Sequence, residues 1–218
     1  MTDRLRVAVL VSGHGSNLQA LIDACQKPGF PAHIVRVISN VRDAFGIQRA
    51  LKAGIPHSVI DHLKFKNRTD FEAQLNDELV SCSAELVCLA GFMRLLTSSF
   101  VKKWQGRLVN IHPSLLPAFK GLDTHARALA AGVKIAGCTV HYVSQDMDAG
   151  PIIAQAAVPV MPNDSEDILA ARILQQEHII FPLALKMIAE GRVKVKHGHV
   201  LFDEISLDDS VIISPRLT

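Results

Sequence analysis

Residues 108–117 carry the side chains best suited to chemistry, in the sequence LVNIHPSLLP. Asn110 and His112 are two residues apart, so both side chains point to the same face of an extended segment. An amide can stabilise an oxyanion, and an imidazole can titrate near neutral pH. The pair therefore indicates acyl transfer. The alternative is a histidine at the end of a strand that only supports the loop held by Pro113 and Pro117.

Residues 11–18 form a glycine-rich turn with the sequence VSGHGSNL. Two glycines let the backbone approach a ligand closely, and the start of the following helix offers N–H groups to an anion. A phosphate fits this turn best. Leu18 occupies the third glycine position of the dinucleotide fingerprint, and no Gly-Lys-Ser/Thr follows, so neither that motif nor a P-loop is present. The alternative is a tight strand-to-helix turn capped by Ser16 or Asn17.

Residues 143–152 form an acidic turn between two predicted strands, with the sequence VSQDMDAGPI. Asp146, Asp148 and Gly150 suit a hairpin turn for purely local reasons. The functional alternative is that Asp148 faces His112, where a carboxylate would favour the imidazolium form. The residues alone favour the turn interpretation.

Alternating strands and helices are predicted to position these segments. The first half has strands at 5–11, 33–39, 56–60 and 86–90, and helices at 18–25, 44–53 and 68–81. The apolar, β-branched run at 5–11 is typical of a strand that is covered on both faces. This order predicts an α/β fold, a Rossmann-like, doubly wound and mostly parallel sheet.

The second half is predicted to add antiparallel strands. Its strands are expected at 108–111, 137–143 and 152–160, its helices at 124–131 and 166–190, and short β-like pieces at 193–213. Asn163, Asp164 and Ser165 cap the long helix, and Pro182 is expected to kink or split it. No linker interrupts the chain, so residues 1–218 are predicted to form one domain with lobes at about 1–105 and 106–218.

The composition excludes several classes of protein. A net charge of +2, from 23 basic and 21 acidic residues, gives no electrostatic case for nucleic-acid binding. The four cysteines lack metal-ligand spacing and are expected to be reduced thiols of a cytoplasmic protein. No signal peptide is recognisable, and the apolar runs are shorter than a membrane span. His197 and His199 are expected at the surface, so no metal is predicted.

Together the motifs resemble the phosphoribosylglycinamide formyltransferases, the folate-dependent glycinamide ribonucleotide transformylases. The matching segments are SGHGSNLQA at 12–20, AGFMR at 90–94, NIHPSLLP at 110–117 and DAGPI at 148–152. They follow the family order and place the resemblance over residues 5–190. The resemblance implies formyl transfer from 10-formyltetrahydrofolate to the amine of glycinamide ribonucleotide in purine biosynthesis, by a cytoplasmic monomer or homodimer.

The resemblance also implies roles for particular residues. The N-terminal lobe would bind phosphate, and the C-terminal lobe would carry catalysis and folate binding. The catalytic positions are Asn110, His112 and Asp148. The ribonucleotide positions are Gly15, Ser16, Asn17, Gln176 and Glu177. The folate positions are Arg68, Met93, Arg94, Leu95, Leu96, Asn110 and Val143. For Glu177, the alternative is a solvated glutamate on a helix.

Two residues depart from the family pattern. His14 stands between the glycines of the turn, where relatives vary, and Leu174 occupies a position that is often polar or basic near the ribonucleotide phosphate. Leu174 cannot donate to a phosphate, so His14 is expected to supply the missing donor. On this hypothesis His14→Ala raises the KM for the ribonucleotide, and an unaltered KM would refute it.

Three alternatives remain at this stage. Formyltetrahydrofolate deformylases share the Asn-x-His and Asp positions, but they usually carry an N-terminal regulatory domain, and they tend to have histidine where Pro113 stands here. Methionyl-tRNA formyltransferases need a C-terminal RNA-binding domain, for which this tail is too short. A non-catalytic nucleotide-binding module would bind ligand without turnover. The main hypothesis is direct attack by the substrate amine, with Asn110 and His112 stabilising the oxyanion.

Overall fold

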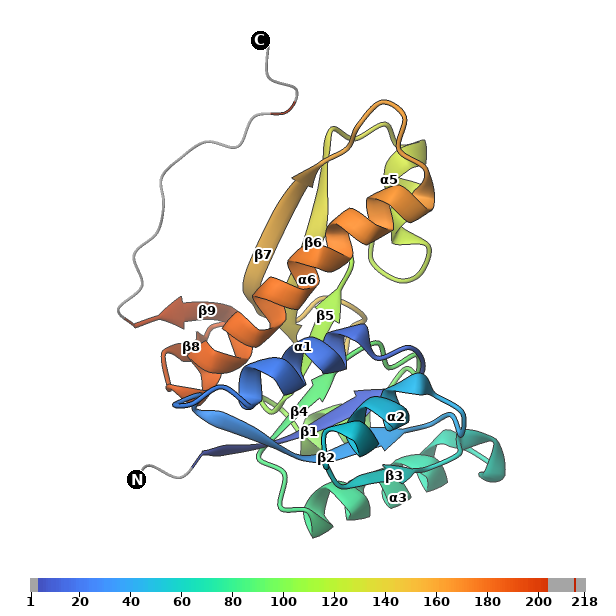
Figure 1. Cartoon of the computed structure of the whole chain (residues 1–218), viewed down its shortest axis with the longest axis vertical. Coiled ribbons are helices and arrows are strands. Elements are labelled where there is room, and N and C mark those ends of the chain that lie inside the picture. The colour runs from blue at the N-terminus through green and yellow to red at the C-terminus, as the bar shows by residue number, and fades with distance from the viewer. Residues whose placement is uncertain (1–3, 204–213, 215–218) are drawn as a thin grey trace.

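A computed structural model describes residues 4–203 and Ser214 of the 218-residue chain. Figure 1 shows a central sheet with helices packed on it. The predicted β-like tail is present as a hairpin of β8 (Val193–Lys196) and β9 (His199–Phe202). The predicted pieces from residue 204 to 213 lie outside the described residues.

The main sheet has seven strands in the order β3-β2-β1-β4-β5-β6-β7. Its strands are β1 (Leu5–Val11), β2 (Ala32–Ser39), β3 (His57–Val59), β4 (Leu86–Leu89), β5 (Leu108–His112), β6 (Ile135–Tyr142) and β7 (Ile152–Pro159). Strands β1 to β5 pair in parallel, whereas β6 is antiparallel to both β5 and β7. The predicted fold class is confirmed. Strand β5 lies at the change from parallel to antiparallel pairing.

Helices cover both faces of this sheet. The larger core cluster includes residues of α1 (Ser16–Cys25), α2 (Phe45–Lys52), α5 (Thr124–Ala130) and α6 (Glu166–Ala189). The smaller cluster includes residues of α3 (Arg68–Ser81) and α4 (Ser98–Lys103). In β1, Val7, Val9 and Val11 belong to the first cluster, and Ala8 and Leu10 to the second. This alternation explains why that strand is apolar throughout.

Two short helical elements were missed by the sequence analysis. Helix α4 and a single 3-10 turn at His62–Lys64 were not predicted. Both are too short to show a clear helical period. The Thr97 hydroxyl accepts from the Phe100 backbone N–H and caps α4, a local signal that could have marked its start.

Helix α6 is continuous through Pro182, so the alternative that proline splits it is wrong. Proline removes one backbone donor, but Phe181, Ala184 and Leu185 beside it are fully buried or nearly so. Packing of this face on the sheet offsets the lost hydrogen bond. The Ser165 side chain accepts from the Ile168 N–H and caps the start, as predicted.

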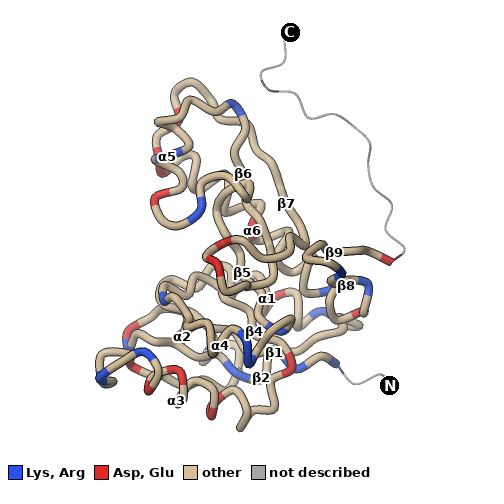
Figure 2. The backbone as a smooth tube through the Cα atoms, turned by 180° about the vertical axis from the view of Figure 1, so that it is seen from behind, with Lys and Arg blue, Asp and Glu red and all other residues tan. Residues whose placement is uncertain are grey.

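By length and composition alone, α6 is also apolar enough to cross a membrane. It contacts α1, β6 and β7, and its buried apolar side chains belong to the larger core cluster. A core helix passes the same test, so this property is weak evidence for a membrane span. Figure 2 shows charges of both signs spread over the described chain.

Candidate active site

The carboxyl end of β5 brings together the polar residues of the Asn-x-His segment. Asn110 pairs with Leu89 of β4 on one side and with His141 of β6 on the other. His112 is the last residue of β5 and pairs with Thr139. In open α/β sheets, the carboxyl ends of the parallel strands are where ligands bind. The edge of the parallel part of the sheet is therefore the candidate site.

His112 is buried and held at both ring nitrogens. Its Nε2 lies 3.0 Å from the carbonyl oxygen of Phe119, which can only accept, so Nε2 carries a proton. Its Nδ1 lies 3.4 Å from Oδ2 of Asp148. When Nδ1 carries a proton, it faces this carboxylate as its acceptor.

Asp148 is held by the turn between β6 and β7. Its φ of 49° is left-handed, a conformation that aspartate tolerates better than most residues. Its Oδ2 accepts from the Gly121 backbone N–H at 2.9 Å, and only 14% of its side chain is exposed. A Cβ on Gly150 would collide with the Tyr142 carbonyl oxygen, so the turn needs glycine there. Asp148 therefore lies in the hairpin turn and also faces His112, while its effect on the charge of His112 stays a prediction.

His141 is a fourth member of this cluster, and sequence reasoning missed it. Its Nδ1 lies 2.9 Å from the Tyr142 carbonyl and so donates to it. Burial lowers the pKa of His141, which keeps the ring neutral and leaves Nε2 as an acceptor. Asn110 Nδ2 lies 3.3 Å from that Nε2, so His141 fixes the amide orientation of Asn110. The sequence signal that could have indicated His141 is a histidine within the otherwise apolar run GCTVHYV at 137–143.

The glycine-rich turn leads directly into α1, which begins at Ser16 rather than at the predicted Leu18. Gly15 is the N-cap residue, with φ of 70° and no side chain to cap the helix. The alternative of a cap by Ser16 or Asn17 is therefore wrong. A Cβ on Gly15 would lie 2.7 Å from Gly46 Cα, so close packing on α2 requires glycine. Among the described residues, no side chain accepts from the first N–H groups of α1, as an anion site needs.

A buried polar pair links α1 to α6. Asn17 Nδ2 donates to Glu177 Oε2 at 2.6 Å, and both residues are more than nine-tenths buried. Burial raises the pKa of Glu177, partly opposed by the Asn17 hydrogen bond. The alternative of a solvated glutamate is wrong. Gln176, next along the helix, is half-buried.

The predicted folate residues are only partly joined by contacts. Leu96 and Val143 pack against the same core cluster, and the Met93 backbone N–H donates to Ser12 Oγ at 2.8 Å. The Met93 and Leu95 side chains are largely exposed, and Nε of Arg94 is buried with no hydrogen-bond partner in the described chain. Arg68 is exposed at the first residue of α3. Folate binding by all of these residues stays a prediction.

A metal site is not apparent in the part of the chain that the structure describes. There, no three His, Cys, Asp or Glu side chains are grouped to hold an ion. His197 follows β8 and His199 begins β9, and both are exposed, as predicted.

Known relatives share both the sequence and the fold. The sequence model of the formyl transferase family matches residues 5–185. Phosphoribosylglycinamide formyltransferase of Haemophilus influenzae is 43% identical over 205 residues, covering 94% of this chain and 97% of that protein. The crystal structure of glycinamide ribonucleotide transformylase 1 from Symbiobacterium toebii has a TM-score of 0.90 and 44% identity, covering 93% of this chain and 95% of that one.

Longer proteins also contain a related segment. The trifunctional purine biosynthetic protein adenosine-3 of Bos taurus is 53% identical over 192 residues, which cover 88% of this chain and 19% of that protein. The chain thus spans about a fifth of the length of that relative. The resemblance seen in the motifs is confirmed, and the chain belongs to the formyl transferase family.

Proposed function

We propose that this protein transfers the formyl group of 10-formyltetrahydrofolate to the amine of glycinamide ribonucleotide, a step of purine biosynthesis. The observation that carries the proposal is the meeting of Asn110, His112 and Asp148 at the end of β5. The names of the relatives, which cover nearly the whole chain, support the choice of substrate.

In this mechanism the neutral amine of the ribonucleotide attacks the formyl carbon, and negative charge develops on the formyl oxygen. Asn110 keeps one amide N–H for that oxygen, because the other faces His141. The imidazolium of His112 stabilises the same charge at short range. When the bond to N10 of the folate breaks, the proton lost by the amine is the one that N10 gains.

Asp148 acts on this step through His112. The carboxylate lies against Nδ1 and balances the charge of the imidazolium in a setting that excludes most water. Asp148 is itself held by the Gly121 N–H, so the carboxylate does not need to reorganise during the reaction. Such pre-positioned charges typically account for a large part of the rate in acyl transfer.

The residues near the site fit a flat co-substrate that carries a carboxylate. Met93 and Leu95 offer exposed apolar surface, and Leu96 and Val143 support it from the core. The Nε of Arg94, which has no hydrogen-bond partner among the described residues, offers a donor for a carboxylate. We therefore assign the folate to this side of β5 and the ribonucleotide to the glycine-rich turn with Glu177.

One assay tests the proposal. The purified protein is mixed with 10-formyltetrahydrofolate, with and without glycinamide ribonucleotide, and release of tetrahydrofolate is followed. We expect release only when the ribonucleotide is present. Equal release without it would indicate a deformylase, and ligand binding without any release would indicate a non-catalytic module. Either result would refute the proposal.

We infer one domain over residues 1–218, with a phosphate-binding lobe at about 1–105 and a catalytic and folate lobe at about 106–218. A monomer or homodimer in the cytoplasm, acting on small molecules rather than nucleic acid or membranes, fits this proposal. Light scattering of the purified protein checks the oligomeric state.

A further inference from the structure

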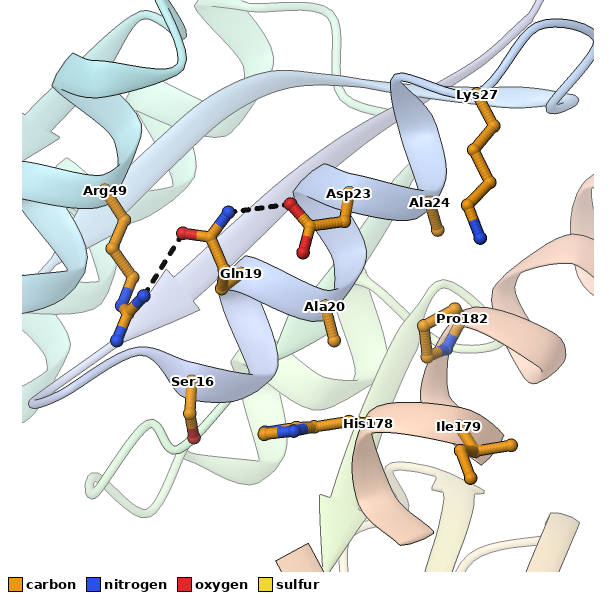
Figure 3. A pocket seen from close by; sticks show the side chains of 10 residues that line it. All are labelled: Ser16, Gln19, Ala20, Asp23, Ala24, Lys27, Arg49, His178, Ile179 and Pro182. Carbon is orange, nitrogen blue, oxygen red and sulfur yellow. Dashed lines mark hydrogen bonds between the residues drawn. The ribbon is translucent and has the colours of Figure 1, made fainter. Parts of the chain in front are cut away.

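A cleft of about 570 Å³ opens between α1 and α6, next to the glycine-rich turn. Figure 3 shows Ser16 and Gln19 reaching into it from α1, His178 from α6 and Arg49 from α2. None of the sequence motifs pointed to Arg49 or His178. The residues that line the cleft are Ser16, Gln19, Ala20, Asp23, Ala24, Lys27, Arg49, His178, Ile179 and Pro182.

Arg49 is firmly oriented at the mouth of this cleft. Its Nε donates to the His14 carbonyl oxygen at 2.9 Å, and its Nη1 donates to Gln19 Oε1 at 3.2 Å. Its guanidinium carbon lies 4.9 Å from the centre of the Phe45 ring. Among the described residues, Arg49 forms no ion pair with a carboxylate. A half-buried guanidinium without a counter-charge is suited to an anionic ligand.

The His14 ring helps to hold Arg49, because its Nδ1 faces the guanidinium. Its Nδ1 lies 3.3 Å from Arg49 Nη2, and because arginine can only donate, Nδ1 accepts. The His14 ring also stacks on Phe45, with centroids 5.3 Å apart. His14 thus fixes the orientation of the Arg49 guanidinium, so that a positive charge is held beside the glycine-rich turn.

Other groups around the cleft are consistent with an anion at its mouth. Nε2 of His178 is buried without a hydrogen-bond partner in the described chain, and burial together with the charge of Arg49 lowers the pKa of that ring. Asp23 also lines the cleft, but its Oδ1 accepts from Gln19 Nε2 at 2.8 Å. Lys27 adds a second cation. The first turn of α1 adds backbone donors and no side-chain cap.

We propose that Arg49 is the cation that binds the phosphate of the ribonucleotide, together with the first N–H groups of α1. This inference rests on the proposed function for the identity of the substrate. The Leu174 side chain of α6 has no polar atom and supplies no positive charge. Arg49 supplies it from α2, and His14 and Phe45 are positioning residues for its guanidinium.

Arg49→Met and Arg49→Lys test this assignment. A hydrogen bond to a charged group is typically worth a factor of about 10–100 in binding, so we expect Arg49→Met to raise the KM for the ribonucleotide by about that factor. Inhibition by inorganic phosphate should weaken by a similar factor. The kcat and the KM for 10-formyltetrahydrofolate should change little. Arg49→Lys should bind the ribonucleotide more tightly than Arg49→Met but less tightly than the wild type. Lysine keeps the positive charge but lacks the several N–H donors of the planar guanidinium.

Lys52→Met is the matched control. Lys52 is an exposed cation on the same helix and does not line the cleft. We expect it to leave the KM for the ribonucleotide and the inhibition by phosphate as in the wild type. Equal losses in both methionine variants would attribute the effect to overall charge and overturn the assignment.

Calorimetric binding of inorganic phosphate separates this inference from the proposed function. A wild-type protein without ribonucleotide-dependent release would refute the function, yet loss of phosphate binding in Arg49→Met would still support the anion site. An active wild type with unchanged KM and unchanged phosphate binding in Arg49→Met would overturn the role of Arg49. If Arg49→Met does not fold, judged by circular dichroism, the same measurements on Arg49→Lys decide: wild-type affinity for both ligands overturns the assignment, and weaker binding supports it.

Discussion

Replacing Asp148 by asparagine removes one charge and little else. Asparagine has nearly the same shape, and its side-chain oxygen can still accept from the Gly121 N–H that holds Asp148 in place. The turn should therefore keep its conformation. The change isolates the electrostatic effect of the carboxylate on His112, 3.4 Å away.

The size of that effect follows from distance and burial. The His112 side chain is 7% exposed and that of Asp148 14%, so solvent screens the pair only in part. Unit charges 3.4 Å apart attract by about 5 kcal/mol at an effective dielectric constant of about 20. We expect Asp148→Asn to lower kcat by about 10²–10³, which corresponds to about 3–4 kcal/mol and lies within that limit.

Steady-state release of tetrahydrofolate, at saturating concentrations of both substrates, measures this loss. Asp146→Asn is the control, because Asp146 lies in the same turn, is exposed and makes no ion pair among the described residues. It should retain the wild-type kcat. A folded Asp148→Asn variant with wild-type kcat would remove the carboxylate from the mechanism.

Further predictions concern the oxyanion pair and two carboxylates outside it. Asn110→Ala and His112→Ala should each lower kcat by at least about 10²-fold, because each removes stabilisation of the oxyanion; the release assay measures both. Glu177→Gln should raise the Tm at pH 8 but also the KM for the ribonucleotide. Burial raises the pKa of Glu177, so its charged form destabilises the fold once the pH exceeds the unfolded pKa of about 4.3. Asp164→Asn should lower the Tm at pH 7, because Arg172 holds the pKa of Asp164 at about 2 through paired hydrogen bonds of 2.6 and 2.7 Å. That stability is present above pH 4 and is lost as the pH falls toward about 2.

Each of these predictions has an outcome that contradicts it. Near wild-type kcat in either alanine variant would exclude that side chain from oxyanion stabilisation. For Glu177→Gln, the gain in Tm must vanish at pH 4, and a gain that persists there would show that the carboxylate charge is not its cause. For Asp164→Asn, a loss of Tm that is equally large at pH 7 and pH 2 would point to packing rather than to the ion pair.

The sequence alone determined the fold class and most of the elements. The uniform apolar run of β1 and the alternation of strands and helices gave a parallel sheet, because local patterning reports which faces are buried. It also singled out Asn110 and His112, since residues two apart on a strand share a face whatever lies around them. Continuity of α6 through Pro182 was not predictable, because it depends on burial of Phe181 and its neighbours against the sheet.

The tertiary structure decided which side chains meet across long stretches of chain. The residues around Asp148 alone favoured a turn. Only the pairing of β5 with β6 brings the Asp148 carboxylate within 3.4 Å of His112 and places His141 beside Asn110. Arg49 lies 35 residues from His14, and nothing local in α2 indicates that its guanidinium supports the glycine-rich turn. Local sequence encodes the period and the caps of single elements, whereas charge partners are set by how separate elements pack.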